Sequence, residues 1–252
     1  MRWMILPRLP LVLLALWAIL TTTAPAAEPA PWPEWRAPII AKFTDDLKRL
    51  DEDIKTRPDS MPLYSFRGDC RLFLGQYAGA VADFEKMIAL DPAQDAQHWR
   101  LGIAYYFAGQ FEKSARQFEK YHAYDGRDRE NGIWQYLANA KVIGVDKARA
   151  AMLVYTQFDR EPFPALYEMF AGKKAPDEVL AEIERKGLTA ETEVVFFGHY
   201  YTGLEEERLG HRERALQLLE KAVSLPQARA PGGPGYMWQV ARLHWERLHT
   251  AK

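Results

Sequence analysis

The chain has 252 residues, of which 48% are hydrophobic and 27% are charged, a composition typical of one or two globular domains. The 33 lysines and arginines nearly balance the 34 aspartates and glutamates, so the basic excess expected of a nucleic-acid-binding protein is missing. The one cysteine, Cys70, excludes an internal disulfide, a thiolate zinc cluster and a C-x-x-C redox pair.

The N-terminal segment has the pattern of an export signal. An uncharged run at residues 9–20 forms only about 18 Å of helix, which is shorter than the ~30 Å hydrocarbon core of a membrane. Small residues follow it up to Ala26 and Ala27. The sequence therefore predicts a signal peptide over residues 1–26, cleaved near Ala26 or Ala27. The mature protein is then expected in the periplasm or cell envelope without membrane insertion, and the alternative is an uncleaved anchor.

Residues 27–38 are rich in proline and predict an extended leader in front of a helical domain, residues 39–252. The leader also contains Trp32 and Trp35, which are unusual in a pure linker. We expect these two side chains to dock either onto the folded body or onto a partner.

The body of the chain repeats with a period of 34 residues. The recurring pairs are Gly68 and Gly102, Gly75 and Gly109, Tyr77 and Phe111, Ala80 and Ser114, and Phe84 and Phe118. A small residue lets the first helix of each unit approach the second, and a glycine near the end of the first helix closes it in the left-handed region. Pro92 stops the first unit. The pattern predicts an all-α fold, a right-handed solenoid of antiparallel helix pairs without strands.

The signal weakens in the middle of the chain and returns near its end. Three markers recur 135 residues after Gly68, Gly75 and Ala80, and they are Gly203, Gly210 and Ala215. The predicted units are clear repeats at 61–94 and 95–128, a degenerate repeat at 129–160, irregular helices at 161–190, a repeat at 196–229 and a capping helix at 236–249.

These markers resemble the tetratricopeptide repeat pattern. Within that class, RLGIAYYFAGQFEKSARQFEKYHAYDG at residues 100–126, followed by IWQYLA at 133–138, is similar to the bacterial NlpI-type lipoprotein family. The resemblance covers roughly residues 63–223. It implies an exported helical adaptor, often a homodimer, that docks cell-wall hydrolases and a processing protease. One departure is that this chain has no cysteine behind the signal segment for lipid attachment.

In this repeat class some positions of the first helices face the inner, concave wall, where aromatic residues and arginine favour protein binding. The candidate protein-binding residues are Phe66, Phe73, Trp99, Arg100, Tyr106, Phe107, Trp134, Tyr200 and Tyr201. Trp99, Arg100 and Tyr106 are the strongest candidates. The alternative for any single one of them is packing in the core.

The sequence shows no recognised catalytic or metal-binding spacing, such as H-E-x-x-H, G-x-S-x-G or a P-loop. We therefore expect no catalytic residues, no metal, no cofactor and no nucleic acid. The predicted function is a non-catalytic adaptor in the cell envelope. One alternative is a structural subunit that forms oligomers through Trp238 and Trp245, and the least favoured is a hydrolase using Glu161, Asp177 and Glu178.

Overall fold

The computed structural model describes residues 32–250, so the predicted signal peptide and residues 27–31 of the leader lie outside the described residues. Within this range the chain forms thirteen α-helices, one short 3-10 helix and no strand, which confirms the predicted all-α solenoid of helix pairs. The elements are α1 (Arg36–Thr56), α2 (Met61–Phe73), α3 (Tyr77–Leu90), η1 (Pro92–Gln94), α4 (Trp99–Phe107), α5 (Phe111–Tyr124), α6 (Arg129–Ile143), α7 (Val145–Ala150), α8 (Phe163–Phe170), α9 (Pro176–Arg185), α10 (Thr192–Arg208), α11 (Arg212–Ser224), α12 (Pro226–Arg229) and α13 (Gly235–Thr250).

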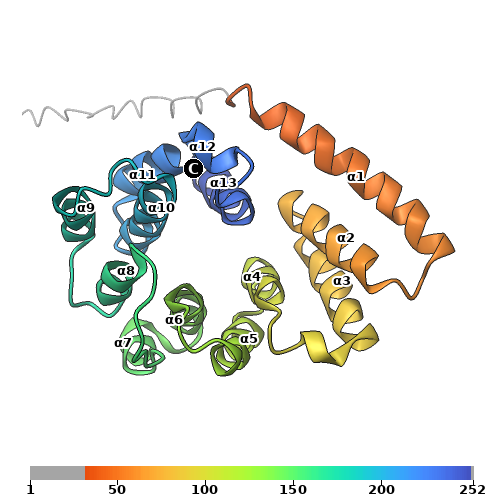
Figure 1. Ribbon diagram of the computed structural model, residues 1–252, viewed down its shortest axis with the longest axis horizontal. Helices are drawn as coiled ribbons and strands as arrows, with labels where there is room; N and C mark the ends of the chain where they lie inside the picture. The colour runs from red at the N-terminus through yellow and green to blue at the C-terminus, as the bar shows by residue number, and fades with distance from the viewer. Residues whose placement is uncertain (1–31, 251–252) are drawn as a thin grey trace, which may run out of the picture. The chain divides into compact units, whose positions relative to one another are not determined.

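The described helices follow one another around a ring, and α13 returns to the side of α2 (Figure 1). The guanidinium of Arg242 on α13 donates a hydrogen bond of 2.6 Å to the backbone oxygen of Phe73 on α2. The ring of Phe73 also packs against Tyr236, with 4.9 Å between the centroids. The last helix therefore closes the solenoid on its first repeat. None of the helices in residues 32–250 combines the length and apolar character that a membrane span requires.

The two clear repeats have the same interior, as their 34-residue period predicts. A Cβ atom on Gly68 would lie 2.5 Å from the ring of Phe84, and one on Gly102 would lie 2.7 Å from the ring of Phe118. Real side chains do not approach so closely, so each glycine is needed where the two helices of its repeat touch. The other markers keep their expected places, with buried Ala80, Ser114 and Ala215 and with φ of +76° at Gly75, +74° at Gly109 and +85° at Gly210.

The middle of the chain departs from this plan. Helix α7 has only six residues, and residues 151–162 form a long connection instead of a full second helix. The close glycine contact of this middle region also differs from that of the two clear repeats, because Gly132 on α6 lies against Tyr155 of that connection and Tyr167 of α8. Prolines begin or precede the two short helices that follow, which is a common position for proline at a helix N-terminus.

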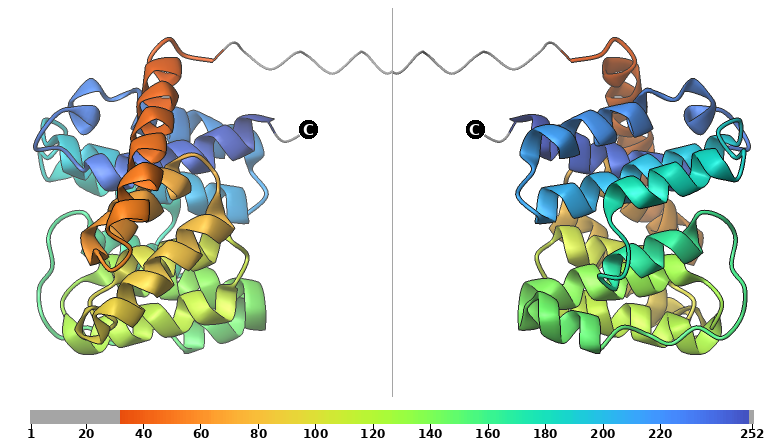
Figure 2. Two further views of the ribbon diagram at one scale, coloured as in Figure 1. Left: turned by 90° about the vertical axis from the view of Figure 1, so that its right-hand side faces the viewer. Right: turned by 90° about the vertical axis from the view of Figure 1, so that its left-hand side faces the viewer.

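The predicted leader is shorter than expected, because α1 already begins at Arg36 and residues 36–38 are helical. Both of its tryptophans dock onto the folded body, on α13. Trp32 lies 5.7 Å from Trp245 and Trp35 lies 5.2 Å from Trp238, measured between ring centroids. An ion pair of 2.7 Å between Arg36 and Glu246 adds to this contact. Helix α1 therefore joins the two ends of the ring, from α13 to the first repeat (Figure 2).

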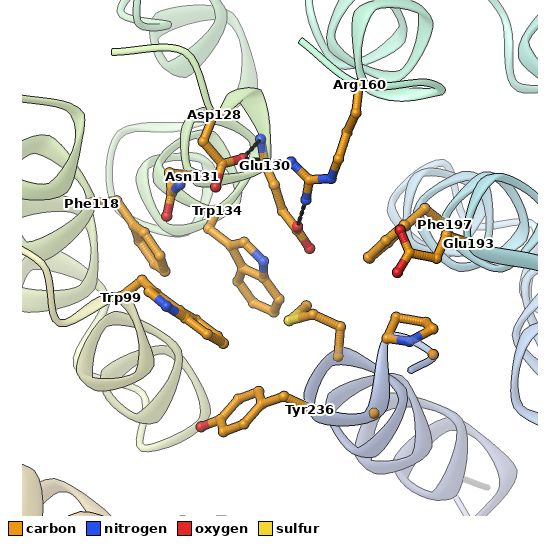
Figure 3. Close-up of a pocket in the computed structure, with 14 residues that line it drawn as sticks. Trp99, Phe118, Asp128, Glu130, Asn131, Trp134, Arg160, Glu193, Phe197 and Tyr236 are labelled. Carbon is orange, nitrogen blue, oxygen red and sulfur yellow. Dashed lines mark hydrogen bonds and ion pairs between the residues drawn. The ribbon is translucent and has the colours of Figure 1, made fainter. Parts of the chain in front are cut away.

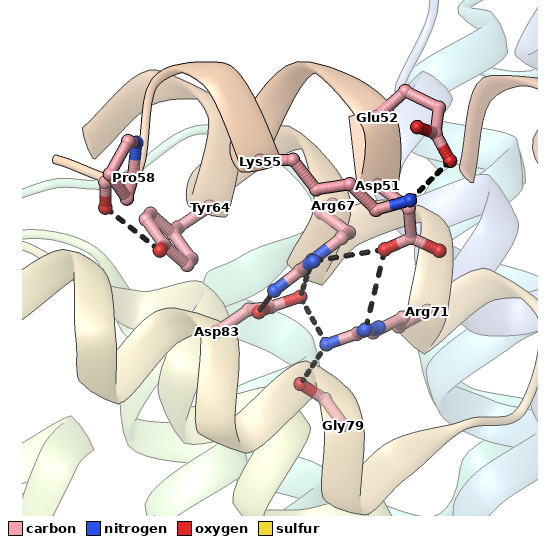
Figure 4. Close-up of polar contacts among 9 residues, drawn as sticks. All are labelled: Asp51, Glu52, Lys55, Pro58, Tyr64, Arg67, Arg71, Gly79 and Asp83. Atoms are coloured by element: carbon pink, nitrogen blue, oxygen red, sulfur yellow. Dashed lines mark hydrogen bonds and ion pairs between the residues drawn. The ribbon is translucent and has the colours of Figure 1, made fainter. Parts of the chain in front are cut away.

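The first repeat carries arginines where apolar residues are expected, and the structure shows why they are tolerated. Arg67 and Arg71 both bind the carboxylate of Asp83 on α3, at 2.7 Å and 2.8 Å. The side chain of Asp83 is 3% exposed, so these bonds are shielded from water. Asp51 on α1 accepts a further bond of 2.9 Å from Arg67 (Figure 4). The arginines thus join α1 to the first repeat, through the shielded carboxylate of Asp83 on α3 and the partly exposed carboxylate of Asp51 on α1.

Candidate functional site

The centre of the ring is filled by a cluster of side chains from four inner helices, which we call the central cluster: Tyr106, Trp134, Tyr200, Tyr201 and His244. The indole of Trp134 donates to the Tyr201 hydroxyl at 3.0 Å, and that hydroxyl donates to Glu130 at 2.6 Å. The Tyr200 hydroxyl and Nδ1 of His244 are 2.8 Å apart. Burial holds the pKa of His244 well below its ordinary value, so the imidazole is neutral.

This cluster corrects part of the predicted binding surface. Trp134, Tyr200 and Tyr201 are at most 1% exposed and Phe73 is 5% exposed, so these four side chains belong to the core. The physical reason is α13, which closes the ring and places His244 and Tyr236 over residues that an open solenoid would leave exposed. The structure also buries Trp238 and Trp245, the two residues predicted to serve oligomer formation.

The other predicted residues are dispersed. Phe66 is 59% exposed beside α1, and Phe107 packs between Tyr77 and His244. Arg100 is held by Asp69 and by the hydroxyl of Ser65. Phe66 and Phe73 line a cavity beside α1, whereas Trp99 and Trp134 line a different one.

That cavity lies at one end of the ring and is called here the N-terminal cavity, because four inner helices begin around it. Its volume is about 380 Å³. Its walls are Trp99, Phe118, Asp128, Glu130, Asn131, Trp134, Arg160, Glu193, Phe197, Gly233, Pro234, Gly235, Tyr236 and Met237 (Figure 3). It combines large aromatic surfaces with a few polar groups, which is the usual character of a ligand site.

Local sequence explains how these residues reach one place. Trp99 begins α4, Glu130 and Asn131 lie in the first turn of α6, and Glu193 lies in the first turn of α10. The first helices of consecutive repeats run parallel, so their first turns meet at the same end of the ring. The breaker-rich loop at residues 231–235 supplies the remaining wall at the start of α13.

A charged network forms the upper wall of the cavity as drawn in Figure 3. Asp128 caps α6 by accepting a bond of 3.0 Å from the backbone amide of Glu130. Arg160 reaches Glu130 at 2.8 Å, and it reaches Asp128 and Asp159 at 3.4 Å each. Burial raises the pKa of Glu130 to about 8, and the Asp128 carboxylate adds to this shift, while Arg160 and Tyr201 oppose it. Glu130 is therefore mostly a neutral acid at pH 7.

Two polar side chains of the cavity have no partner within residues 32–250. Asn131 is only 4% exposed, yet its amide makes no hydrogen bond with any described residue. Glu193 is exposed at the cavity edge and forms no ion pair there. Unpartnered polar groups facing a cavity are available to a ligand. The acidic lining residues Asp128, Glu130 and Glu193 were not among the predicted site residues, although acidic side chains at the starts of inner helices are a signal that could have found them.

Another cavity, of about 220 Å³, lies where the same helices end. Tyr106, Lys141, Glu207, Arg208 and Arg247 are among its lining residues. The central cluster separates it from the N-terminal cavity, since Tyr106 contacts Trp134 at 5.3 Å between ring centroids. Of the predicted site residues, Tyr106 thus contributes to this cavity.

Candidate chemical groups elsewhere are occupied by structural contacts. The carboxylates of Glu161 and Asp177 pair with Lys186 and Arg214, at 2.7 Å and 2.8 Å. Glu178 accepts from the backbone amide of Ala175 at 2.6 Å, which caps α9. Within residues 32–250, no group of three histidine, cysteine, aspartate or glutamate side chains is arranged to hold a metal ion.

Comparison with known proteins identifies the repeat class. The tetratricopeptide repeat family matches residues 62–94, which are α2, α3 and η1. The chain is 28% identical over 88 residues to the protein SGT1 homolog of Bos taurus. It is 29% identical over 89 residues to the Hsp70-Hsp90 organizing protein of Triticum aestivum. Each match covers 35% of this chain, and they cover 26% and 15% of the two relatives. The chain thus contains a tetratricopeptide repeat and matches about a quarter or less of these relatives.

Proposed function

We propose that the protein is a non-catalytic adaptor that binds segments of other proteins in the N-terminal cavity. The observation that carries this proposal is the cavity itself, with Trp99 at its edge and the unpartnered amide of Asn131 in its wall. The repeat class supports it, because proteins built from stacked helix pairs commonly bind other proteins. The name of the wheat relative, an organizing protein for Hsp70 and Hsp90, also denotes a protein that brings others together.

The same proposal includes the cellular location of the protein and the class of its partners. The predicted signal peptide and the NlpI-type resemblance favour an exported adaptor that organises cell-wall hydrolases or a processing protease. Cell fractionation, with N-terminal sequencing of the mature chain, tests the export. A mature chain that begins near residue 27 or 28 in the envelope fraction supports it, whereas an intact N-terminus in the cytosolic fraction contradicts it.

Affinity capture with matched variants tests the adaptor function. The immobilised mature chain is exposed to an envelope extract of its own organism, and captured proteins are quantified by mass spectrometry. Trp99→Ala should lower the capture of specific partners at least about fivefold, because buried aromatic contacts carry much of the energy of protein interfaces. The control is Tyr124→Ala, which removes an aromatic ring that is 61% exposed and outside the cavity.

Only variants that remain folded can decide the outcome of the capture experiment. Circular dichroism should show parent-like helicity for both variants, and Asn131→Ala serves as a second cavity variant if Trp99→Ala loses structure. Equal capture by the parent and a folded cavity variant would place the binding surface elsewhere. A structural subunit is the second candidate, and light scattering of the purified chain would reveal a stable oligomer.

A further inference from the structure

We propose that the N-terminal cavity is a receptor for a basic side chain, a lysine or arginine carried by an extended segment of the partner protein. This inference rests on the proposed function and adds the chemistry of the partner. It is argued from the charges, the aromatic walls and the unpartnered polar groups of the cavity.

The charge of the cavity is negative once its internal pairs are counted. Arg160 is the one lysine or arginine in the lining, and its guanidinium already bonds to Asp128, Glu130 and Asp159. Glu193 has no cation beside it within the described residues, so its carboxylate is available. Even with Glu130 neutral, the two carboxylates of Asp128 and Glu193 exceed the single charge of Arg160. A cation entering the cavity therefore meets a net attraction.

The aromatic walls offer the faces on which cations rest. Trp99 and Tyr236 meet edge to face, with 4.8 Å between centroids. The rings of Trp134 and Phe197 are 1% and 4% exposed and stack on neighbouring rings of the core, so they close the wall behind this pair. The wall already holds one guanidinium in this way. The Arg160 guanidinium carbon lies 5.7 Å from the ring centroid of Phe197, and it lies 4.2 Å from Phe163 just behind the wall. A second basic group can thus combine cation–π contact with the Glu193 carboxylate.

Size and hydrogen bonding favour a single side chain in an extended segment. A volume of about 380 Å³ accommodates a lysine or arginine with part of its flanking backbone, but not a folded domain. The nearly buried amide of Asn131 offers both a donor and an acceptor, so it can bond to the basic group or to the flanking peptide.

The helix N-termini around the cavity argue against a basic ligand. Four N-termini carry partial positive charge, which favours an anion. However, Asp128 already caps α6, and Glu193 lies in the first turn of α10, so carboxylates of the protein stand where that charge is strongest. An acidic partner is therefore the outcome that would contradict the inference.

Short peptides test the charge preference on the mature full-length chain. The probes are acetyl-Gly-Ala-X-Ala-Gly-amide, with X as lysine, arginine, norleucine or glutamate, and binding is followed by the indole resonances of Trp99 and Trp134. The lysine and arginine peptides should bind at least about fivefold more tightly than the norleucine peptide. The glutamate peptide should bind least. Raising the salt from 50 to 500 mM should weaken the binding of the basic peptides alone.

A matched pair of variants assigns the effect to the cavity. Glu193→Gln should weaken the lysine peptide about fivefold and leave the norleucine peptide unchanged. Glu213→Gln is the control, because Glu213 is also exposed in the first turn of a helix, α11, but lies outside the cavity. Glu193 is a surface residue, so neither variant endangers the fold.

Tighter binding of the glutamate peptide, or an equal affinity of Glu193→Gln for lysine, would overturn the inference. So would the absence of any saturable shift with all four peptides. These results leave the adaptor proposal to be judged separately, because that proposal depends on Trp99-dependent capture of partner proteins.

Discussion

In residues 61–128 each helix pair closes on itself, with a glycine of the first helix under a phenylalanine ring of the second. Gly68 and Phe84 make this contact in one pair, and Gly102 and Phe118 make it in the next. In residues 129–190 the close glycine, Gly132, instead meets tyrosines of the following connection and of α8. In this region Arg160 also ties its connection to the start of α6, because it bonds to Asp128 and Glu130, about 30 positions earlier in the chain.

This difference separates two ways of building the same ring. The regular repeats need only a local pattern, because the contacting residues are 16 positions apart. The middle segment depends on polar contacts between separate elements, and those contacts form the wall of the N-terminal cavity. The part of the ring that departs from the repeat pattern therefore builds much of the candidate site.

The largest effect should come from the buried charges of the first repeat. Asp83→Ala leaves Arg67 and Arg71 without their shielded carboxylate, and we expect a loss of about 3 kcal/mol in the free energy of unfolding. Urea denaturation followed by circular dichroism measures it. Asp45→Ala is the control, because the Asp45–Lys48 pair is about three-quarters exposed and should contribute less than about 1 kcal/mol.

Arg160 is the corresponding charged residue of the middle segment, and its removal tests the comparison further. Arg160 is 44% exposed, and its partner Glu130 can hold a proton when the guanidinium is removed. Arg160→Ala should therefore destabilise the protein at neutral pH by about 1 kcal/mol, less than Asp83→Ala does. Equal losses in the free energy of unfolding for Arg160→Ala and Asp83→Ala would show that the two charge networks contribute equally to stability.

Glu130 should make stability depend on pH. Its pKa in the folded protein is about 8, above the ordinary value of 4.5, so the unfolded chain loses this proton first as the pH rises. The contribution of Glu130 is full below pH 4.5 and is lost as the pH rises through 8, with a slope of up to about 1.4 kcal/mol per pH unit. Glu130→Gln resembles the neutral acid and should abolish this slope.

Denaturation curves of parent and variant at several pH values between 5 and 8 give the slope as their difference. The difference is needed because buried histidines act in the opposite direction. Burial lowers the pKa of His98 to about 3 and that of His199 to about 4, so stability falls as the pH drops below 6.5. Parallel curves for the parent and Glu130→Gln would contradict the buried, neutral state of this carboxyl.

A further prediction concerns the close glycines of the two regions. Gly102→Ala places a methyl group 2.7 Å from the fully buried ring of Phe118, and the overpacking should cost about 1 to 3 kcal/mol. Gly132→Ala meets Tyr155 and Tyr167 at similar distances, but Tyr155 lies in the connection 151–162, which can shift. We expect the smaller loss there, measured as the difference in melting temperature. A larger loss at Gly132 would reverse the comparison.

The regular half of this architecture could be predicted from the sequence because its contacts recur at a fixed spacing. Gly68, Gly102 and the two phenylalanines were assigned correctly on that ground. The return of α13 to α2 could not be predicted, since Arg242 and Phe73 are 169 positions apart and periodicity fixes only which face of a helix is buried. Trp99 and Trp134 follow the repeat pattern, so they could be predicted as site residues. Arg160 lies in the long connection 151–162, so the repeat period could not predict its place in the cavity wall.

Effects smaller than that of Asp83→Ala should appear where glycines end the inner helices. Gly109 has a φ of +74° with no atom within 4 Å of an added Cβ, so Gly109→Ala should cost about 1 kcal/mol through the backbone alone. Gly144, which ends α6 in the middle segment, also has open space around it.

The two glycines nevertheless differ in backbone conformation. Gly144 combines a φ of 83° with a ψ of 161°, a region that is almost restricted to glycine. Gly144→Ala should thus cost about 2 kcal/mol, roughly twice the loss at Gly109, as measured by urea denaturation. Because neither methyl group meets a neighbour, packing cannot produce that ratio. Equal losses would mean that the turn after α6 relaxes to the conformation used in the regular repeats.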